Sequence, residues 1–422
     1  MASLAVLVCL VCAALASDAA AVRVELTRVH ADPSVTASQF VRAALHRDMH
    51  RHNARKLAAS SSDGTVSAPV SPTTVPGEFL MTLAIGTPPL PFPAIADTGS
   101  DLIWTQCAPC SRQCFQQPTP LYNPSSSTTF SALPCNSSLG LCAPACACMY
   151  NMTYGSGWTY VFQGTETFTF GSSTPADQQR EQRLQRLVRV RPRRAGQGEP
   201  VARLPARRPQ VLLLPHAVPG HQQHEHALPR PSASLNDTGV VSSTPFVASP
   251  TSIYYYLNLT GISLGTTALP IPPSAFSLKA DGTGGLIIDS GTTITMLGNT
   301  AYQQVRAAVL SLVTLPTTDG SAATGLDLCF ELPSSTSAPP SMPSMTLHFD
   351  GADMVLPADN YMMSLSDPDS DSSLWCLAMQ NQTDTDGVVV SILGNYQQQN
   401  MHILYDVGKE TLSFAPAKCS TL

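Results

Sequence analysis

The chain has 422 residues, of which 12% are charged and 43% hydrophobic, and it contains 26 Gly and 36 Pro. This length is enough for two sizeable domains, and the composition favours strands and turns over a helical protein. The net charge of −6 is unevenly divided: residues 1–76 carry +2, residues 177–230 carry +7 and the remainder carries −15. So few Lys and Arg in this remainder argue against a nucleic-acid partner. The excess of carboxylates suits an acidic medium, where their protonation relieves the repulsion between like charges.

The N-terminus predicts a secreted product. Residues 1–16 carry no charge, are apolar from Leu4 to Leu15 and end in small residues, which is typical of a cleaved signal peptide. No later stretch is long and apolar enough to span a bilayer, so we expect no membrane contact in the mature form. The expected destination is extracellular, including the cell wall, or vacuolar.

Residues 17–76 are predicted to be a propeptide and its linker. Four apolar residues lie at helical spacing: Phe40, Val41, Ala44 and Leu45. A basic run over 46–52 follows them, and a Ser/Pro/Thr-rich stretch over 60–76 reads as an exposed linker. A solvated tail is one interpretation. The one we favour is a propeptide whose cations cover an acidic cleft until acid weakens the contact, which would make the protein a zymogen.

The strongest motif is a short acidic turn that occurs twice. The two copies are Asp97-Thr98-Gly99-Ser100 and Asp289-Ser290-Gly291-Thr292, each directly after an apolar run. An Asp that ends a buried strand and is followed by Gly sits in a tight turn, with its carboxylate at the open side. Two unrelated turns are the alternative, but two copies 192 residues apart favour two lobes that each contribute one carboxylate to a shared cleft. We place the lobes at 77–245 and 246–422.

Removal of the signal leaves ten cysteines, an even number in an oxidising compartment. Cys107-x-x-Cys110 is compatible with zinc, but no His/Cys quartet of suitable spacing follows it. A loop stapled by disulfides is therefore favoured, and we expect no metal and no cofactor. Five N-glycosylation sequons fit the secretory route: Asn136, Asn151, Asn236, Asn258 and Asn381.

Residues 150–170 alternate like a β-hairpin whose tip is Gly155-Ser156-Gly157. A mobile hairpin that carries an aromatic side chain, here Tyr154, is suited to close over a substrate. Taken alone, Tyr154 is more often a plain core residue.

Residues 178–230 differ from the rest of the chain. They use nine residue types and contain neither Ser nor Thr, and no strand alternation is visible. A nucleic-acid patch of arginines and a metal-binding tract of His221, His224 and His226 are both conceivable, but neither fits a secreted, acidic, strand-rich body. A disordered insert or an out-of-frame translation explains the composition better. The abrupt return to ordinary composition at Ser232 favours the frame error.

The second half returns to strand patterning. A helix is expected over Tyr302–Leu312, with four residues on its apolar face: Val305, Ala308, Val309 and Leu312. Strands are expected over 345–349, 353–356, 375–379, 388–393 and 401–405. Ile392-Leu393-Gly394 can pass close to the second acidic turn, because glycine has no side chain.

These motifs together resemble the pepsin-like aspartic endopeptidases, and specifically their nepenthesin-like branch. The matching elements are the two acidic turns, Trp104-Thr105-Gln106-Cys107, the cysteines after it, Tyr154-Gly155 and Ile392-Leu393-Gly394-Asn395. The resemblance covers about residues 77–176 and 232–420 and is absent over 178–230. It implies an all-β, bilobal fold with the active site between the lobes, a monomer, and polypeptide substrates.

The resemblance also assigns roles. Asp97 and Asp289 would be catalytic and hold one water between them, with Ser100 and Thr292 bonded to the outer carboxylate oxygens and Thr98 and Ser290 tying the loops together. Tyr154 would close over the substrate, with its hydroxyl held by the Trp104 indole. The implied disulfides are Cys107–Cys110, Cys135–Cys148, Cys142–Cys146 and Cys329–Cys376.

A rival function remains. A catalytically silent relative could bind or inhibit other proteins with the same architecture, although both acids are present here. The segment 178–230 also bears on activity, because the family places there the apolar-apolar-Gly strand that supports the first acidic turn. We expect the segment to stay disordered and the chain as written to be a defective, inactive product.

Overall fold

The structure is a computed structural model. It describes residues 22–28, 36–59, 79–99, 103–109, 117, 119–132, 141–142, 148–154, 157–170, 188–190, 201–202, 210–215, 240–249, 254–332, 339–366, 373–382, 390–406 and 409–417. These residues form an all-β fold with two α-helices and three short 3₁₀ turns. The predicted all-β class is confirmed.

The elements before residue 216 belong to the first half of the chain. They are β1 (Val22–Arg28), α1 (Ala37–Ala59), β2 (Phe79–Ile85), β3 (Leu90–Ala96), a 3₁₀ turn (Pro124–Ser126), β4 (Ser131–Ala132), β5 (Leu141–Cys142), β6 (Cys148–Tyr154), β7 (Gly157–Thr165), β8 (Phe168–Phe170), β9 (Val188–Val190), β10 (Val201–Ala202) and β11 (Gln210–Pro215). The helical spacing around residues 40–45 and the predicted hairpin correspond to α1 and to β6–β7, and the propeptide role of this region stays a prediction.

The remaining elements begin at residue 242. They are β12 (Ser242–Val247), β13 (Tyr256–Leu257), β14 (Leu259–Leu264), β15 (Thr267–Ala268), a 3₁₀ turn (Pro273–Phe276), β16 (Leu286–Ile288), β17 (Thr295–Gly298), α2 (Asn299–Leu312), β18 (Thr317–Thr318), β19 (Cys329–Leu332), β20 (Met345–Phe349), β21 (Ala352–Leu356), a 3₁₀ turn (Ala358–Asn360), β22 (Met362–Ser366), β23 (Ser373–Leu377), β24 (Met379–Gln382), β25 (Ser391–Leu393), β26 (Met401–Asp406) and β27 (Thr411–Pro416).

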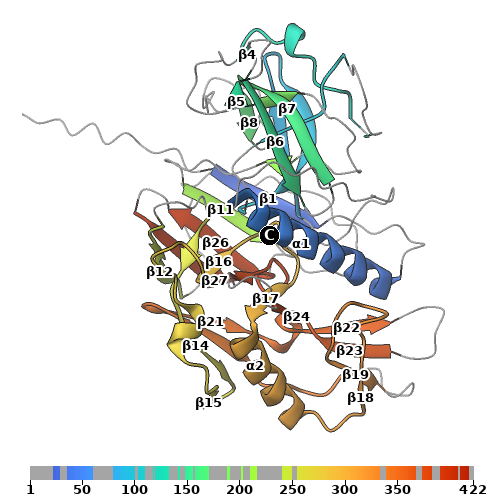
Figure 1. Ribbon diagram of the computed structural model, residues 1–422, viewed down its shortest axis with the longest axis vertical. Helices are drawn as coiled ribbons and strands as arrows, with labels where there is room; N and C mark the ends of the chain where they lie inside the picture. Colours follow the sequence, from blue (N-terminus) through green and yellow to red (C-terminus); the bar gives the residue numbers. More distant parts are fainter. Residues whose placement is uncertain are drawn as a thin grey trace, which may run out of the picture.

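One long sheet connects the two halves of the molecule. Its strands follow the order β10-β3-β2-β1-β11-β26-β27-β12-β13-β16-β25-β17-β24, with β8 also paired to β2. Figure 1 shows β4–β8 at one end, the strands of the second half at the other, and β1, β11, β26 and β27 between them. Both acidic turns follow strands of this sheet, because β3 ends at Ala96 and β16 ends at Ile288.

The anomalous segment contributes three strands, which differs from the sequence-based expectation. β10 pairs in parallel with Ile95–Ala96, and β11 lies between β1 and β26. The expectation that no part of 178–230 enters a sheet is wrong for these residues. β10 and β11 coincide with apolar runs of the segment, whereas β9 has Arg189 at its centre. Whether the segment arises from a frame error stays a prediction.

The second half follows its sequence pattern closely, with one exception. Expected strands are found at β20, β21, β23, β25 and β26, and the expected helix is α2. Val305 and Val309 are fully buried, but Leu312 is 50% exposed. Leu312 is the last residue of the helix, so the predicted apolar face ends one turn earlier. The lobe boundary at 245/246 stays a prediction, and β12 runs across it.

Candidate active site

The two acidic turns have the same internal geometry. Asp97 and Asp289 are both fully buried. Each carboxylate accepts a hydrogen bond through Oδ1 from the backbone N–H of the glycine two residues on, at 2.9 Å from Gly99 and at 2.9 Å from Gly291. A carboxylate that accepts its own loop's N–H is fixed in orientation at the mouth of the turn.

Four hydrogen bonds join the two turns to each other. The Thr98 N–H donates to Ser290 Oγ at 3.1 Å, and the Ser290 N–H donates to Thr98 Oγ1 at 2.9 Å. Each hydroxyl then donates across the same boundary, Ser290 Oγ to Ala96 O at 2.7 Å and Thr98 Oγ1 to Ile288 O at 3.3 Å. This near-symmetric set holds the strand ends before the two acids side by side. The sequence-based suggestion that Thr98 and Ser290 tie the loops together agrees with this geometry.

The second turn is supported from behind by the strand the sequence singled out. β25 pairs in parallel with β16, and Asp289 N–H donates to Leu393 O at 3.1 Å. A Cβ on Gly394 would lie 2.6 Å from the carbonyl carbon of Ile294, so only glycine fits there. The predicted close approach of Gly394 is therefore confirmed at the residues directly after the turn.

Hydroxyl and amide side chains complete the second turn. Thr292 Oγ1 donates to Asp289 Oδ2 at 2.6 Å, as expected from the resemblance. The amide nitrogen of Asn395 donates to Ser290 O at 3.0 Å, and that of Gln398 donates to Leu393 O at 3.0 Å. Sequence reasoning missed Gln398. The amide-rich run Gln397-Gln398-Gln399 was the available signal, because three buried amides in a row need specific partners. Ser100, the counterpart of Thr292, lies outside the described residues.

The hairpin β6–β7 packs against the helix α1 through β6. β6 and β7 are antiparallel, and Tyr154 lies opposite Gly157, as the predicted hairpin requires. Gly155 and Ser156 lie outside the described residues. The Tyr154 side chain is not described. Trp104 is buried and packs with Ile95, directly before the first acidic turn.

The helix α1 is docked beside the second acidic turn, which the sequence did not reveal. Asp48 Oδ2 accepts from the Thr293 N–H at 2.7 Å, and Arg47 Nη2 donates to Thr293 Oγ1 at 2.6 Å. Arg47 and Asp48 are both buried and form an ion pair at 2.9 Å. Sequence reasoning identified the basic run over 46–52 but assigned no role to Asp48, the acidic residue within it. We call Arg47, Asp48 and Thr293 the helix latch.

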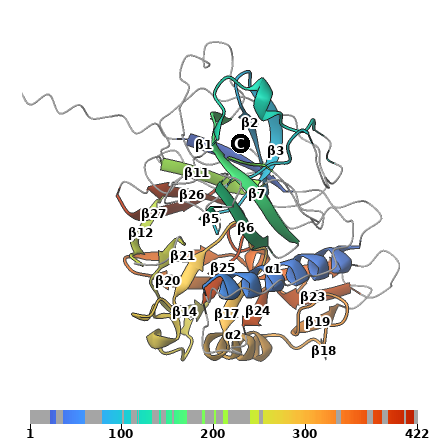
Figure 2. The same ribbon diagram turned by 45° about the horizontal axis from the view of Figure 1, so that its top comes forward.

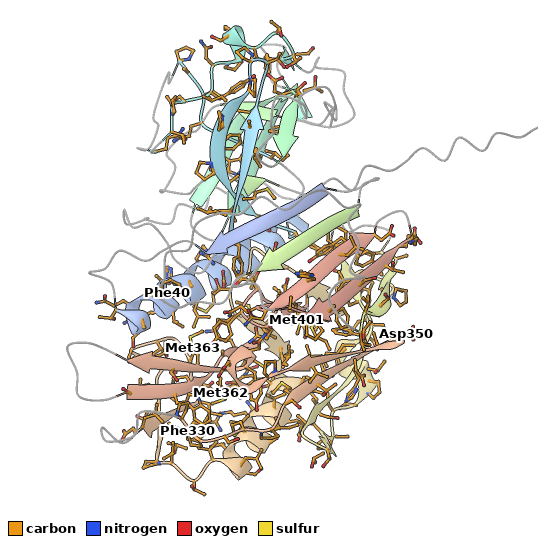
Figure 3. The ribbon with its side chains drawn as sticks, turned by 180° about the vertical axis from the view of Figure 1, so that it is seen from behind. Phe40, Phe330, Asp350, Met362, Met363 and Met401 are labelled. Atoms are coloured by element: carbon orange, nitrogen blue, oxygen red, sulfur yellow. A yellow bond between two sulfur atoms is a disulfide. The ribbon has the colours of Figure 1, made fainter. Side chains whose placement is uncertain are left out.

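Apolar contacts anchor the same helix. Val41 and Leu45 are buried in a cluster with residues of the second half: Ile294, Leu326, Cys329, Met363, Leu365, Cys376 and Ala378. Gly325, with φ +85°, leaves room for Leu45, because a Cβ there would meet Leu45 Cδ1 at 2.9 Å. Figure 3 shows Phe40 of α1 above Met363, and Figure 2 shows α1 between β6 and the second-half strands. The helix therefore contacts both sides of the site.

Of the expected disulfides, the structure contains Cys329–Cys376, with an S–S distance of 2.03 Å between β19 and β23. Cys107 is buried, and its predicted partner Cys110 lies outside the described residues. The register places Cys142 opposite Cys148, but their side chains are not described. The pairs that involve Cys135 and Cys146 also fall outside the described ranges. These three pairs stay predictions.

Asn258 is exposed, as a glycosylated side chain must be. Asn136 and Asn236 are not among the described residues, and the side chain of Asn151 is not described. Asn381 is partly buried and donates to Asn299 Oδ1 at 2.9 Å. Over the described ranges, no group of three or more His, Cys, Asp or Glu side chains is placed to hold a metal ion. Neither α1 nor α2, the helices described, is long and apolar enough to cross a membrane.

The chain is similar to known proteins along most of its length. Two family models match, described as "Xylanase inhibitor N-terminal" over residues 79–188 and "Xylanase inhibitor C-terminal" over residues 254–416. It is 40% identical to aspartic proteinase nepenthesin-1 of Nepenthes gracilis and 37% identical to nepenthesin-2 of the same species, each over 94% of this chain and 90% of the relative.

A solved structure shares the fold. The crystal structure of edgp superimposes with a TM-score of 0.58 at 14% identity, and the match covers 83% of this chain and 94% of that one. The acidic turns, their mutual hydrogen bonds and the similarity along both halves lead to one conclusion. This chain belongs to the nepenthesin-like family of pepsin-fold aspartic proteinases.

Proposed function

We propose that the chain is a secreted zymogen that becomes an acid endopeptidase. The observation that carries this proposal is the set of four hydrogen bonds between Thr98 and Ser290 and the strand ends beside them. They hold two buried Asp-hydroxyl-Gly turns against each other, so that Asp97 and Asp289 act as one unit. Polypeptides are the proposed substrates.

The chemistry follows from two neighbouring carboxylates that cannot both ionise at low cost. Aspartic proteases are the standard example, in which such a pair works with one proton between its two carboxylates. The ionised carboxylate takes a proton from a water as that water attacks the peptide carbonyl, and the protonated one donates to the carbonyl oxygen. Thr292 fixes the outer oxygen of Asp289. We assign the same role to Ser100 at Asp97.

The hairpin β6–β7 is the proposed lid. Tyr154 and Gly155 would close over the substrate, and Trp104 would hold the lid from below. This assignment is supported by the hairpin register, by the burial of Trp104 and by its packing on Ile95 before Asp97.

The helix α1 is the proposed inhibitory element. Its contacts with β6 on one side and β22 on the other would keep polypeptides from the acids. The latch holds the helix on the second lobe, because Asp48 accepts from Thr293 N–H and forms an ion pair with Arg47. Opening of the latch would release the helix, and cleavage in the linker over 60–76 would make its loss permanent.

Secretion rests on the signal-like residues 1–16 and on the sequons. The extracellular space, the cell wall and the vacuole remain the proposed destinations, and a monomer is the proposed state. A fusion of residues 1–16 to a reporter protein tests the route, because a functional signal would release the reporter into the medium.

A non-catalytic function is the second candidate. Both matching family models carry the description of xylanase inhibitors, and residues 189–253 lie between the two matches. One experiment separates the candidates. The purified chain is incubated in acid and mixed with denatured globin, with and without a statine-type transition-state mimic. Cleavage that the mimic blocks and a metal chelator does not supports the protease. An intact, folded chain that never cleaves globin supports the second candidate.

A further inference from the structure

A second cluster of reactive side chains lies on a separate sheet of the second half. This sheet has four strands in the order β15-β14-β20-β21 and is distinct from the long sheet that carries the acidic turns. Burial alternates along β20 and β21, so one face packs on the core and the other meets solvent. Ser263, His348 and Asp353 all lie on the solvent side.

The three side chains form a continuous chain of hydrogen bonds. Ser263 Oγ lies 2.7 Å from His348 Nε2, and His348 Nδ1 lies 2.7 Å from Asp353 Oδ1. A carboxylate only accepts, so the neutral imidazole carries its hydrogen on Nδ1 and its free lone pair on Nε2. Nε2 then accepts from the Ser263 hydroxyl. This order of hydroxyl, imidazole and carboxylate is the arrangement that activates a serine nucleophile.

The register explains why the three side chains meet. His348 is directly opposite Asp353 on β21, and Ser263 pairs with Thr346, two residues before His348 on the same face. A bulge lies between Leu259 and Gly261 on β14, and bulges re-aim nearby side chains. The pleat therefore places one hydroxyl, one imidazole and one carboxylate in a diagonal row across three strands.

The row is open to small molecules. The His348 side chain is 34% exposed and that of Asp353 is 61% exposed. The residue opposite His348 on β14 is Gly261, and a Cβ there would have only His348 Cδ2 within 4 Å, at 4.0 Å. The glycine thus leaves one edge of the imidazole uncovered. A planar ester can approach along this edge.

We propose that Ser263, His348 and Asp353 form a second reactive site, at which Ser263 accepts an acyl group from aryl esters or thioesters. The Ser263 oxygen forms a bond to the ester carbonyl carbon as its proton passes to His348 Nε2. The bond from that carbon to the phenol or thiol breaks, and the leaving group takes the proton from the imidazolium. Water repeats the sequence on the acyl-serine and releases the carboxylic acid. Asp353 holds the imidazole in the tautomer that both steps need.

The lack of a backbone donor for the oxyanion limits the substrates to esters with good leaving groups. Backbone N–H groups within a sheet are directed at the neighbouring strands, so the developing oxyanion at this site is solvated by water. A missing oxyanion donor costs on the order of 100- to 1,000-fold in rate. Peptide bonds and alkyl esters are then too slow to react. Esters of phenols and thiols react because their leaving groups need little assistance.

The test measures acetylation of the full chain by p-nitrophenyl acetate at neutral pH. The chain carries Asp97→Asn to prevent self-digestion, so the result does not depend on the proposed protease activity. Peptide mapping follows acetyl-Ser263 with time. Ser413 is the matched control, because its hydroxyl lies 2.7 Å from that of Ser243, with no imidazole in the pair. We expect Ser263 to react roughly 100-fold faster than Ser413, the lower end of general-base catalysis.

Two variants complete the test. His348→Gln should slow acetylation of Ser263 to the rate of Ser413, and Asp353→Asn should slow it by at least about tenfold through loss of the correct tautomer. Near-ultraviolet circular dichroism confirms that each variant is folded. Acetylation of Ser263 no faster than of Ser413, or unchanged in folded His348→Gln, would overturn the proposal.

Discussion

The two acidic turns share the same internal hydrogen bonds but differ in the strands that support them from behind. Each carboxylate accepts the N–H of its own glycine at 2.9 Å. Behind Asp289, β25 pairs over three residues with β16, and Gly394 follows it against the backbone of Ile294. Behind Asp97, β10 pairs over only two residues with β3. The residue after β10 is Arg203, whereas the residue after β25 is Gly394. The second turn is supported by its own lobe to a greater extent than the first.

Because of this difference, the hydrogen bonds between the lobes contribute more to the position of Asp97 than to that of Asp289. Ser290 donates its hydroxyl to Ala96 O and accepts the Thr98 N–H, so the second lobe positions the strand end before Asp97. The first turn depends on the second for its geometry. Loss of a cross-lobe bond should therefore disturb Asp97 more than Asp289, because β25 still supports the second turn.

The largest effect is expected for Gly394→Val. The added side chain would begin 2.6 Å from the Ile294 carbonyl carbon, and backbone cannot move aside as a flexible side chain can. Overpacking of this kind costs about 1–3 kcal/mol of unfolding free energy, and here it also displaces the strand behind Asp289. We expect acid protease activity to vanish and urea unfolding to shift to lower concentration. Wild-type activity in folded Gly394→Val would contradict the support we assign to this strand.

Ser290→Ala should have the next largest effect. It removes two of the four hydrogen bonds between the turns and leaves the carboxylate contacts of Asp289 in place. A small misplacement of one catalytic group lowers kcat on the order of 100-fold. Thr292→Val is the matched control, since it removes one bond within the second turn and none between turns. If Ser290→Ala had a smaller effect on kcat than Thr292→Val, the cross-lobe bonds would not be what positions Asp97.

Asp48→Asn tests whether the helix latch holds α1 on the second lobe, and its effect should be the third largest. The substitution removes a buried ion pair, and breaking such a pair costs about 3–5 kcal/mol. The helix should leave the second lobe more readily, and activation at a given acidic pH should be at least about tenfold faster. Arg42→Ala is the control on the same helix, because it removes an exposed hydrogen bond to the second half, Arg42 Nη1 to Ala322 O at 2.6 Å, and leaves the buried ion pair in place. Equal activation rates, followed by gel electrophoresis, would remove Asp48 from the latch.

The smallest effect is expected at the turn that leads into β16. The hydroxyl and the N–H of Thr283 bond to Asp281 and hold the pKa of its carboxyl below the usual value. A lowered folded-state pKa means that the stabilisation is present above the unfolded-state pKa and is lost as pH falls through the folded-state value. Asp281→Asn should therefore lower the melting temperature slightly at pH 6 and not at pH 2. A larger difference at pH 2 would reverse the sign and refute the assignment.

Much of the fold was predictable because local sequence patterns, such as apolar runs and helical spacing, define its elements. The runs before Asp97 and Asp289 are buried strands, and the spacing of Val305 and Val309 gives α2 its core face. The docking of α1 was not predictable, because Asp48 meets Thr293 across 245 residues and nothing in the neighbouring sequence indicates that partner. The strands within 178–230 were missed for a related reason. A two-residue strand such as Val201–Ala202 has no period of its own, and only its pairing with β3 defines it.

The hydrogen bonds between Thr98 and Ser290 hold together Asp97 and Asp289, the proposed catalytic unit. The most direct measurement is the rate of denatured-globin cleavage in acid by the full 422-residue chain, compared with Asp97→Asn and Asp289→Asn. The sequence alone predicted an inactive chain, because it left the first acidic turn without a supporting strand. Since β10 pairs with the strand before Asp97, we predict instead that the chain cleaves globin and that each variant retains less than a few per cent of the rate, roughly the consequence of losing one partner of an acid–base pair. Cleavage that survives either substitution, or a cooperatively folded wild-type chain with no activity in acid, would contradict it.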